Sequence, residues 1–182
     1  MSELTGDWDK VANLLNPARM KQKLHQAAAR VGNYGASEIK KGITSGAPGG
    51  EKFAPLSPLT IARKGSSKPL LDEGDLRDSA TYAILDHDNV FIGVKKMAKK
   101  KGKDGKEKDL ANIAAVHEFG CTIPVTPKMR AYLHHEGIHL KASTQYVNIP
   151  ARPFLRPIFN SNEFREKIAE IYLTAIKEAF MP

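Results

Sequence analysis

The sequence has few of the residues from which disulfide-rich and membrane-spanning proteins are built. It contains one cysteine, Cys121, which excludes an internal disulfide framework or a cysteine-rich zinc site and favours synthesis in a reducing cytoplasm. The longest apolar run is four residues, as at 113–116, whereas a membrane helix needs about 20. The first ten residues carry acids and no apolar segment, unlike a secretory signal. We therefore expect no membrane contact.

Sequence signatures of catalysis are missing as well. The glycine-rich stretch 46–50 is not followed by the Lys-Ser/Thr pair of a phosphate-binding loop, and no dinucleotide fingerprint follows a strand. His117 and Glu118 resemble half of a zinc-protease helix, but no second histidine follows at position 121. Cys121, which stands there, is better explained as small buried filler than as a nucleophile paired with His117. We predict no catalytic residues, no cofactor and no enzyme activity.

The densest group of metal-ligand side chains is formed by His134, His135, Glu136 and His139. Adjacent helical residues point about 100° apart, so neighbouring histidines rarely bind one ion. A histidine-rich helix end also interacts favourably with the helix dipole without any metal. We therefore predict no metal site.

Positive charge is concentrated in one segment. The chain has 28 Lys and Arg against 20 Asp and Glu, a formal net charge of +8, and residues 95–109 contribute eight lysines and three acids. Arginine and aromatic side chains, which commonly read or stack on nucleic acid, are absent from this segment. We predict a flexible Lys-rich loop over 95–109, and a DNA-contacting basic protein stays an alternative.

Length and composition predict the domain organisation. With 182 residues, 41% of them hydrophobic, we expect a single domain over 1–182 that begins with an N-terminal extension over 1–16. The spacing of apolar residues in this extension predicts a short amphipathic helix over 5–15.

Two long helices are expected, one toward each end of the chain. Asn16-Pro17 is a helix-start signal, and apolar residues at spacings of three to five predict a helix of about 28 residues that ends at Gly46. Asn160 and Glu163 form the pattern of a capping box for the last helix, whose apolar stripe runs to Ala179.

Between the long helices, the pattern predicts short helices and about four antiparallel strands. We expect helices over 58–64, 110–119 and 127–135, an extended segment over 122–125, and two hairpins, one pairing 80–85 with 90–94 and one pairing 138–140 with 146–149. The fold class is therefore α+β, with a small sheet packed by the long helices.

Three stretches stand out as a set. They are Phe53-Ala54-Pro55-Leu56-Ser57 with Leu70-Leu71-Asp72-Glu73-Gly74-Asp75-Leu76, then His117-Glu118-Phe119-Gly120, then Pro150-Ala151-Arg152-Pro153-Phe154-Leu155-Arg156. Together, in this order, they resemble the phage virion morphogenesis family, which comprises tail completion or head–tail joining neck proteins and minor tail proteins. The resemblance covers roughly residues 17–175, and the Lys-rich segment departs from it.

The resemblance implies a structural virion protein at the head–tail junction, or neck, of a tailed phage. Such a tail completion protein forms a homo-oligomeric ring, a hexamer, that binds connector or head-completion proteins and tail terminator or tail tube proteins. It would be assembled in the host cytoplasm and located in the virion, with non-specific contact to genomic DNA and no membrane partner. An alternative is a tail terminator ring that caps the tail tube.

The same resemblance points to interface candidates in two proline-rich segments. Proline restricts the backbone, so these segments lose less entropy on docking, and arginine and aromatic side chains are favoured interface anchors. The candidates are Phe53, Pro55, Leu56, Leu70, Leu71, Arg152, Phe154 and Arg156. We expect both arginines to point outward, whereas Phe154 has the alternative of packing into the core.

Overall fold

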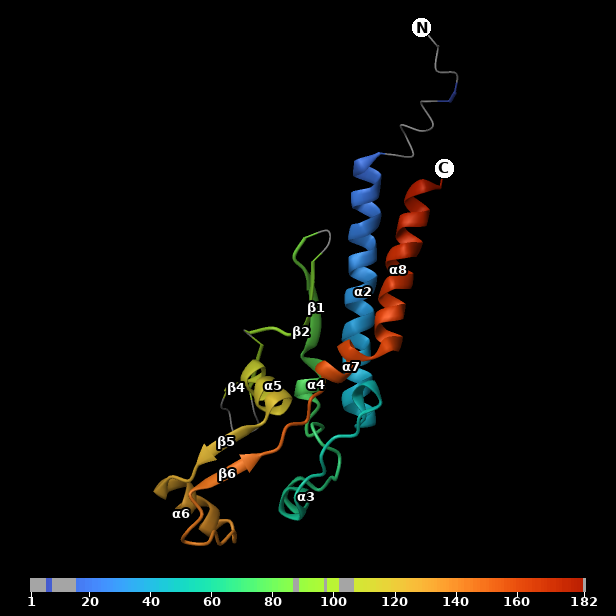
Figure 1. The fold of residues 1–182 in the computed structure, drawn as a ribbon. Helices are drawn as coiled ribbons and strands as arrows, with labels where there is room; N and C mark the ends of the chain where they lie inside the picture. Colours follow the sequence, from blue (N-terminus) through green and yellow to red (C-terminus); the bar gives the residue numbers. More distant parts are fainter. Residues whose placement is uncertain (1–5, 8–15, 87–88, 97, 102–106, 182) are drawn as a thin grey trace.

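The computed structural model describes residues 6–7, 16–86, 89–96, 98–101 and 107–181. The helix predicted over 5–15, apart from residues 6–7, and the middle of the predicted Lys-rich loop therefore lie outside the described residues. Figure 1 shows two long helices side by side, with a β-hairpin against one of them and the shorter elements gathered at one end of this pair.

The first long helix, α2, spans Pro17–Ser45, so its prediction is confirmed. The side chain of Asn16 accepts a hydrogen bond from the Ala18 N–H at 2.9 Å, and Pro17 occupies the first helical position. The helix ends because Gly46 adopts a left-handed conformation, with φ of 74°, which glycine enters without steric cost.

Two glycines inside α2 allow a β-hairpin to approach it closely. A Cβ atom at Gly32 would lie 2.2 Å from Cδ2 of Tyr82, and one at Gly35 would lie 2.7 Å from Cδ1 of Ile92. Tyr82 belongs to β1 (Ala80–Ile84) and Ile92 to β2 (Val90–Val94). Glycine weakens the interior of a helix, and these two glycines are the points where the hairpin contacts α2.

The second long helix, α8, spans Asn162–Phe180 and packs along α2 in the antiparallel direction. Near one end of the pair, Lys23 of α2 forms an ion pair with Glu178 at 3.0 Å. Near the other end, the rings of Tyr34 and Phe164 stack with centroids 5.4 Å apart. The helix start predicted at Asn160 is wrong by one residue, because the side chain that caps α8 belongs to Ser161.

The strands confirm the α+β class, but among the described residues they form three separate two-stranded antiparallel ladders instead of one small sheet. The first joins β1 and β2 as predicted. The others join β3 (Lys99–Lys101) to β4 (Glu107–Asp109) and β5 (Cys121–Pro124) to β6 (Tyr146–Ile149). Residues 95–109, predicted as a flexible loop, therefore contain a ladder at 99–101 and 107–109.

The hairpin predicted between 138–140 and 146–149 is wrong, because β6 pairs with β5. The carbonyl groups of Leu140, Lys141 and Thr144 accept hydrogen bonds from the Arg130 guanidinium at 3.3, 3.0 and 2.7 Å. These carbonyls are therefore hydrogen-bonded to a side chain of the helix at 127–135 and do not pair with a strand.

The short helices are α3 (Pro58–Lys64), α4 (Asp75–Asp78), α5 (Leu110–Phe119), α6 (Pro127–His135) and α7 (Arg156–Asn160), with a 3₁₀ turn at Pro48–Gly50. Those predicted over 58–64, 110–119 and 127–135 are confirmed as α3, α5 and α6, whereas α4 and α7 were not predicted. Ser57, Asp109 and Thr126 each accept a backbone N–H at a helix start, which is why these starts are readable from the sequence.

The core lies where the base of the α2–α8 pair meets α4, α5 and α7. Its buried members come from all these elements and are Ile39, Ile43, Leu76, Ala80, Ala114, Phe154, Ile158 and Phe164. No helix within the described residues is long and apolar enough to cross a membrane.

Candidate interaction site

A buried carboxylate connects the second and third of the unusual stretches. Glu118, near the end of α5, is buried and accepts three backbone hydrogen bonds. Its Oε2 accepts the N–H groups of Phe154 at 2.8 Å and Leu155 at 3.0 Å, and its Oε1 accepts the N–H of Arg156 at 3.0 Å. The carboxylate therefore binds the donors that precede and begin α7, a favourable place for negative charge.

A buried guanidinium connects the third stretch to the first. Arg152 donates from Nε to the carbonyl of Ala54 at 2.7 Å and from Nη2 to that of Pro55 at 2.8 Å. Its backbone N–H donates to the carbonyl of His117 at 2.7 Å. The outward orientation predicted for Arg152 is wrong, since its side chain is buried and burial lowers its pKa from the ordinary value. We call these Glu118 and Arg152 contacts together the motif junction.

A glycine allows the two sides of the motif junction to approach. Gly120 follows α5 with φ of 76°. A Cβ atom there would lie 3.1 Å from the carbonyl oxygen of Ile149 and 3.1 Å from the nitrogen of Ala151. The backbone of 149–151 thus passes directly over this glycine, immediately before the segment that Glu118 holds.

The structure divides the predicted interface candidates into buried and accessible groups. Phe154 is fully buried in the core, so the alternative of internal packing is confirmed for it. Phe53, Leu70 and Leu71 are partly buried and pack against the same core. Pro55 and Arg156 are exposed, and Leu56 is half-buried; these three remain available to a partner.

An aromatic–arginine pair on the surface was not predicted from the sequence. Phe119 is 70% exposed, and Cζ of Arg156 lies 5.4 Å from the centroid of its ring. A guanidinium placed over the face of an aromatic ring is attracted to that ring electrostatically. The Arg156 Nε lies 4.0 Å from Glu118, which tethers this pair to the motif junction. The available signal was a large aromatic residue placed between Glu118 and a helix-ending glycine.

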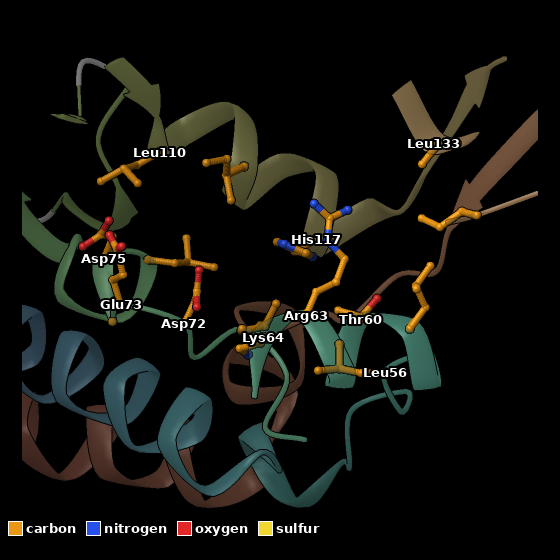
Figure 2. Close-up of a pocket in the computed structure, with 16 residues that line it drawn as sticks. Leu56, Thr60, Arg63, Lys64, Asp72, Glu73, Asp75, Leu110, His117 and Leu133 are labelled. Carbon is orange, nitrogen blue, oxygen red and sulfur yellow. The ribbon is translucent and has the colours of Figure 1, made fainter. Parts of the chain in front are cut away.

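A cavity of about 780 Å³ lies beside the motif junction, between α3, α5, α6 and the segment 70–76. Figure 2 shows acidic side chains at one end of it and the basic side chains of α3 with His117 toward the other. Two interface candidates, Leu56 and Leu70, line this cavity. Arg63 spans from α3 to α6, donating to the Tyr132 hydroxyl at 3.1 Å and pairing with Glu136 at 3.0 Å.

His117 lines this cavity and is partly buried. Its Nδ1 is buried and has no hydrogen-bond partner among the described residues. Burial lowers the pKa of His117 from its ordinary value, and the positive charges of Arg152 and Lys64 lower it further. With its pKa below 6.5 the imidazole is mostly neutral at pH 7, and within the described part of the chain no carboxylate is hydrogen-bonded to its Nδ1.

The histidines singled out from the sequence as possible metal ligands lie at the end of α6, where two of them contact each other. The rings of His134 and His139 meet edge to face with centroids 4.5 Å apart. Within the part of the chain that the structure describes, no three His, Cys, Asp or Glu side chains are grouped to hold a metal ion.

Comparison with known proteins supplies the identity. The model of the phage virion morphogenesis family matches residues 7–177, nearly the whole chain. No curated protein and no solved structure matches. The matched range includes α2, all of α8 except its last three residues, and every residue of the motif junction. The chain belongs to the phage virion morphogenesis family.

Proposed function

We propose that this protein is a structural component of the phage neck, which forms a ring at the head–tail junction and completes the tail for joining. The observation that carries the proposal is the family match over residues 7–177. The family favours a structural role over a catalytic one. The partners would be other copies of this chain, connector or head-completion proteins, and tail terminator or tail tube proteins.

The motif junction supports a role in rigid docking. Glu118 and Arg152 use side-chain charge to fix backbone segments that are distant in sequence. Segments fixed in this way lose little conformational entropy when a partner binds. The accessible residues next to the junction, Phe119 and Arg156, are of the types that anchor interfaces.

The proposal is tested by locating the chain in intact particles. A small affinity tag on the chain, labelled with gold and imaged by electron microscopy, should mark the neck between head and tail. Loss of the gene should give full heads and finished tails that remain separate. Label at the distal tail tip, or joined particles without the gene, would overturn the proposal. A tail terminator, by contrast, predicts tails of uncontrolled length when the gene is lost.

A further inference from the structure

The segment that forms one wall of the cavity beside the motif junction contains no buried residue. Residues 56–69, which include α3, are all exposed or half-buried, and no described helix or strand packs extensively against α3. Both ends of the segment are fixed to the rest of the protein. The carbonyl of Pro55 accepts a hydrogen bond from Arg152, and Leu71 packs against the core. We call residues 56–69 the strap.

One side chain connects the middle of the strap to the opposite wall of the cavity. The Arg63 guanidinium donates to the hydroxyl of Tyr132 in α6 at 3.1 Å and pairs with Glu136, which follows that helix, at 3.0 Å. We call these two contacts the latch. The side chains of Arg63 and Glu136 are 48% and 31% exposed, so water competes for both groups. Pairs of this kind contribute little to stability, so the latch can break without disturbing the core.

The strap is followed by a strained turn. Leu70 has φ of 56° and is the one residue other than glycine with a positive φ in the described part of the chain. The N–H of Leu71 donates to the carbonyl of Pro69 at 2.7 Å, which closes a γ-turn around Leu70 in its rare, strained form. The surrounding contacts therefore hold Leu70 in an unfavourable conformation, which movement of the strap can release.

The strap also has hydrogen bonds of its own. The Ser57 hydroxyl accepts the N–H of Thr60 at 3.2 Å, and the N–H of Gly65 closes the helix on the carbonyl of Ile61 at 2.8 Å. The ammonium group of Lys64 donates to the carbonyl of Lys68. These bonds join residues within the strap, so none of them is lost when the strap changes position as one piece.

We propose that the strap swings away from the cavity as a unit while the rest of the protein stays folded, with Arg63 as its latch and Leu70 as its hinge. Figure 2 shows Leu56 of the strap and Leu110 of α5 on different walls of the cavity. Opening therefore exposes apolar side chains that the closed strap shields. The inference does not depend on the proposed function, because it concerns the isolated chain.

Chemical labelling of a thiol beneath the strap measures this opening in the full chain. The reporter is Ile113→Cys on the α5 wall of the cavity, in a chain whose own thiol is removed by Cys121→Ser. Leu133→Cys, on the α6 side of the same cavity, is a second reporter if the first variant does not fold. The labelling rate relative to that of the urea-unfolded chain gives the open fraction. Because opening exposes less surface than unfolding, this rate should change little with urea below the unfolding transition.

Variants on both sides of the latch test its role. Arg63→Ala should raise the labelling rate by about fivefold, since it removes one exposed ion pair and one hydrogen bond. Lys68→Ala is the matched control, because it removes an exposed strap cation outside the latch and should leave the rate unchanged. Adding Tyr132→Phe to Arg63→Ala should cause no further increase, because both substitutions break the same contact.

A second pair of variants tests the hinge. Leu70→Gly and Leu70→Ala both remove the leucine side chain beyond Cβ, but only glycine adopts a φ of 56° without strain. Labelling should therefore be slower in Leu70→Gly than in Leu70→Ala. At a position with negative φ the order would be reversed, because glycine has more freedom in the open form.

Four results would contradict the inference. Labelling with the urea dependence of global unfolding would show that the strap opens only when the core unfolds. Labelling as fast as in the unfolded chain would show that the strap does not shield the cavity. Equal rates for Arg63→Ala and its Lys68→Ala control would refute the latch, and equal rates for the two Leu70 variants would refute the hinge.

Discussion

Glu118 accepts the backbone N–H of Phe154 at 2.8 Å, although the two residues are 36 positions apart. Phe154 is fully buried, so a carboxylate from α5 fixes the backbone of a central core residue. Two of the three stretches that identify the family thus meet in one contact. The residue types in these stretches are therefore explained mainly by contacts inside the protein. Their second effect is to hold neighbouring exposed side chains where a partner could bind them.

We predict that Glu118→Ala strongly destabilises the protein. The change leaves three backbone N–H groups without their acceptor, which should lower the free energy of unfolding by about 3 kcal/mol or more. Glu118→Gln should lie between, because its amide retains one oxygen acceptor. Urea unfolding measures both, with Glu166→Ala on the exposed side of α8 as control. A Glu118→Ala variant as stable as this control would contradict the role of the motif junction.

Substitutions of the two arginines in the third stretch should have different effects: one should lower stability, and the other should impair the joining of heads to tails. Arg152→Ala removes the donors to Ala54 and Pro55 and should cost roughly 2–4 kcal/mol of unfolding free energy. Arg156→Ala, at an exposed position, should cost less than about 1 kcal/mol. If the surface beside Phe119 binds a neck partner, particles with Arg156→Ala should contain heads and tails that fail to join. Infectious, joined particles would contradict that interface assignment.

Acid should destabilise the protein through His117. Its pKa in the folded chain is below the ordinary 6.5, so below pH 6.5 the unfolded chain binds a proton that the folded chain does not. The free energy of unfolding should therefore fall as pH decreases from 6.5 toward the lowered pKa, by at most about 1.4 kcal/mol per pH unit. His117→Gln should flatten this part of the profile, and His25→Gln, at an exposed position, serves as comparison. An unchanged slope in His117→Gln would refute the assignment.

The lysines of the β3–β4 hairpin and of the segment that precedes it should affect DNA contact more than stability. The one ion pair described within this hairpin, Lys99 with Glu107 at 3.0 Å, is exposed and contributes little. Replacing Lys95, Lys96, Lys99 and Lys101 by Gln should therefore shift the melting temperature by less than about 8 °C. If the chain contacts DNA, the salt dependence of duplex binding should become shallower by about 0.9 per lost phosphate contact. No duplex binding by the wild type at low salt would contradict the DNA-contact alternative.

Helix starts and the first hairpin were predictable because the residues that determine them are close together in the sequence. Asn16-Pro17, Ser57-Pro58 and Thr126-Pro127 each specify a helix start within a few residues, and the structure follows them. The first hairpin was also predictable, because its alternating apolar residues flank a turn-forming segment.

Long-range partners could not be predicted in the same way. The orientation of Arg152 depends on carbonyl groups 97 and 98 positions away, and no periodic pattern encodes them. The partner of β6 was mispredicted because the carbonyl groups of Leu140 and Lys141 accept hydrogen bonds from Arg130 and do not pair with β6. The exposure of Leu173, Ile176 and Phe180 was overlooked because one apolar stripe already explained why α8 is a helix.

The motif junction also bears on how far related sequences can drift apart. Glu118 receives its three bonds from backbone N–H groups, and Arg152 gives its two to backbone carbonyls. A substitution at position 54, 155 or 156 therefore keeps the bond, provided that the new residue follows the same backbone path and retains its N–H where one is donated. Two charged side chains can in this way preserve one architecture while the residues they hold evolve freely to suit new docking partners.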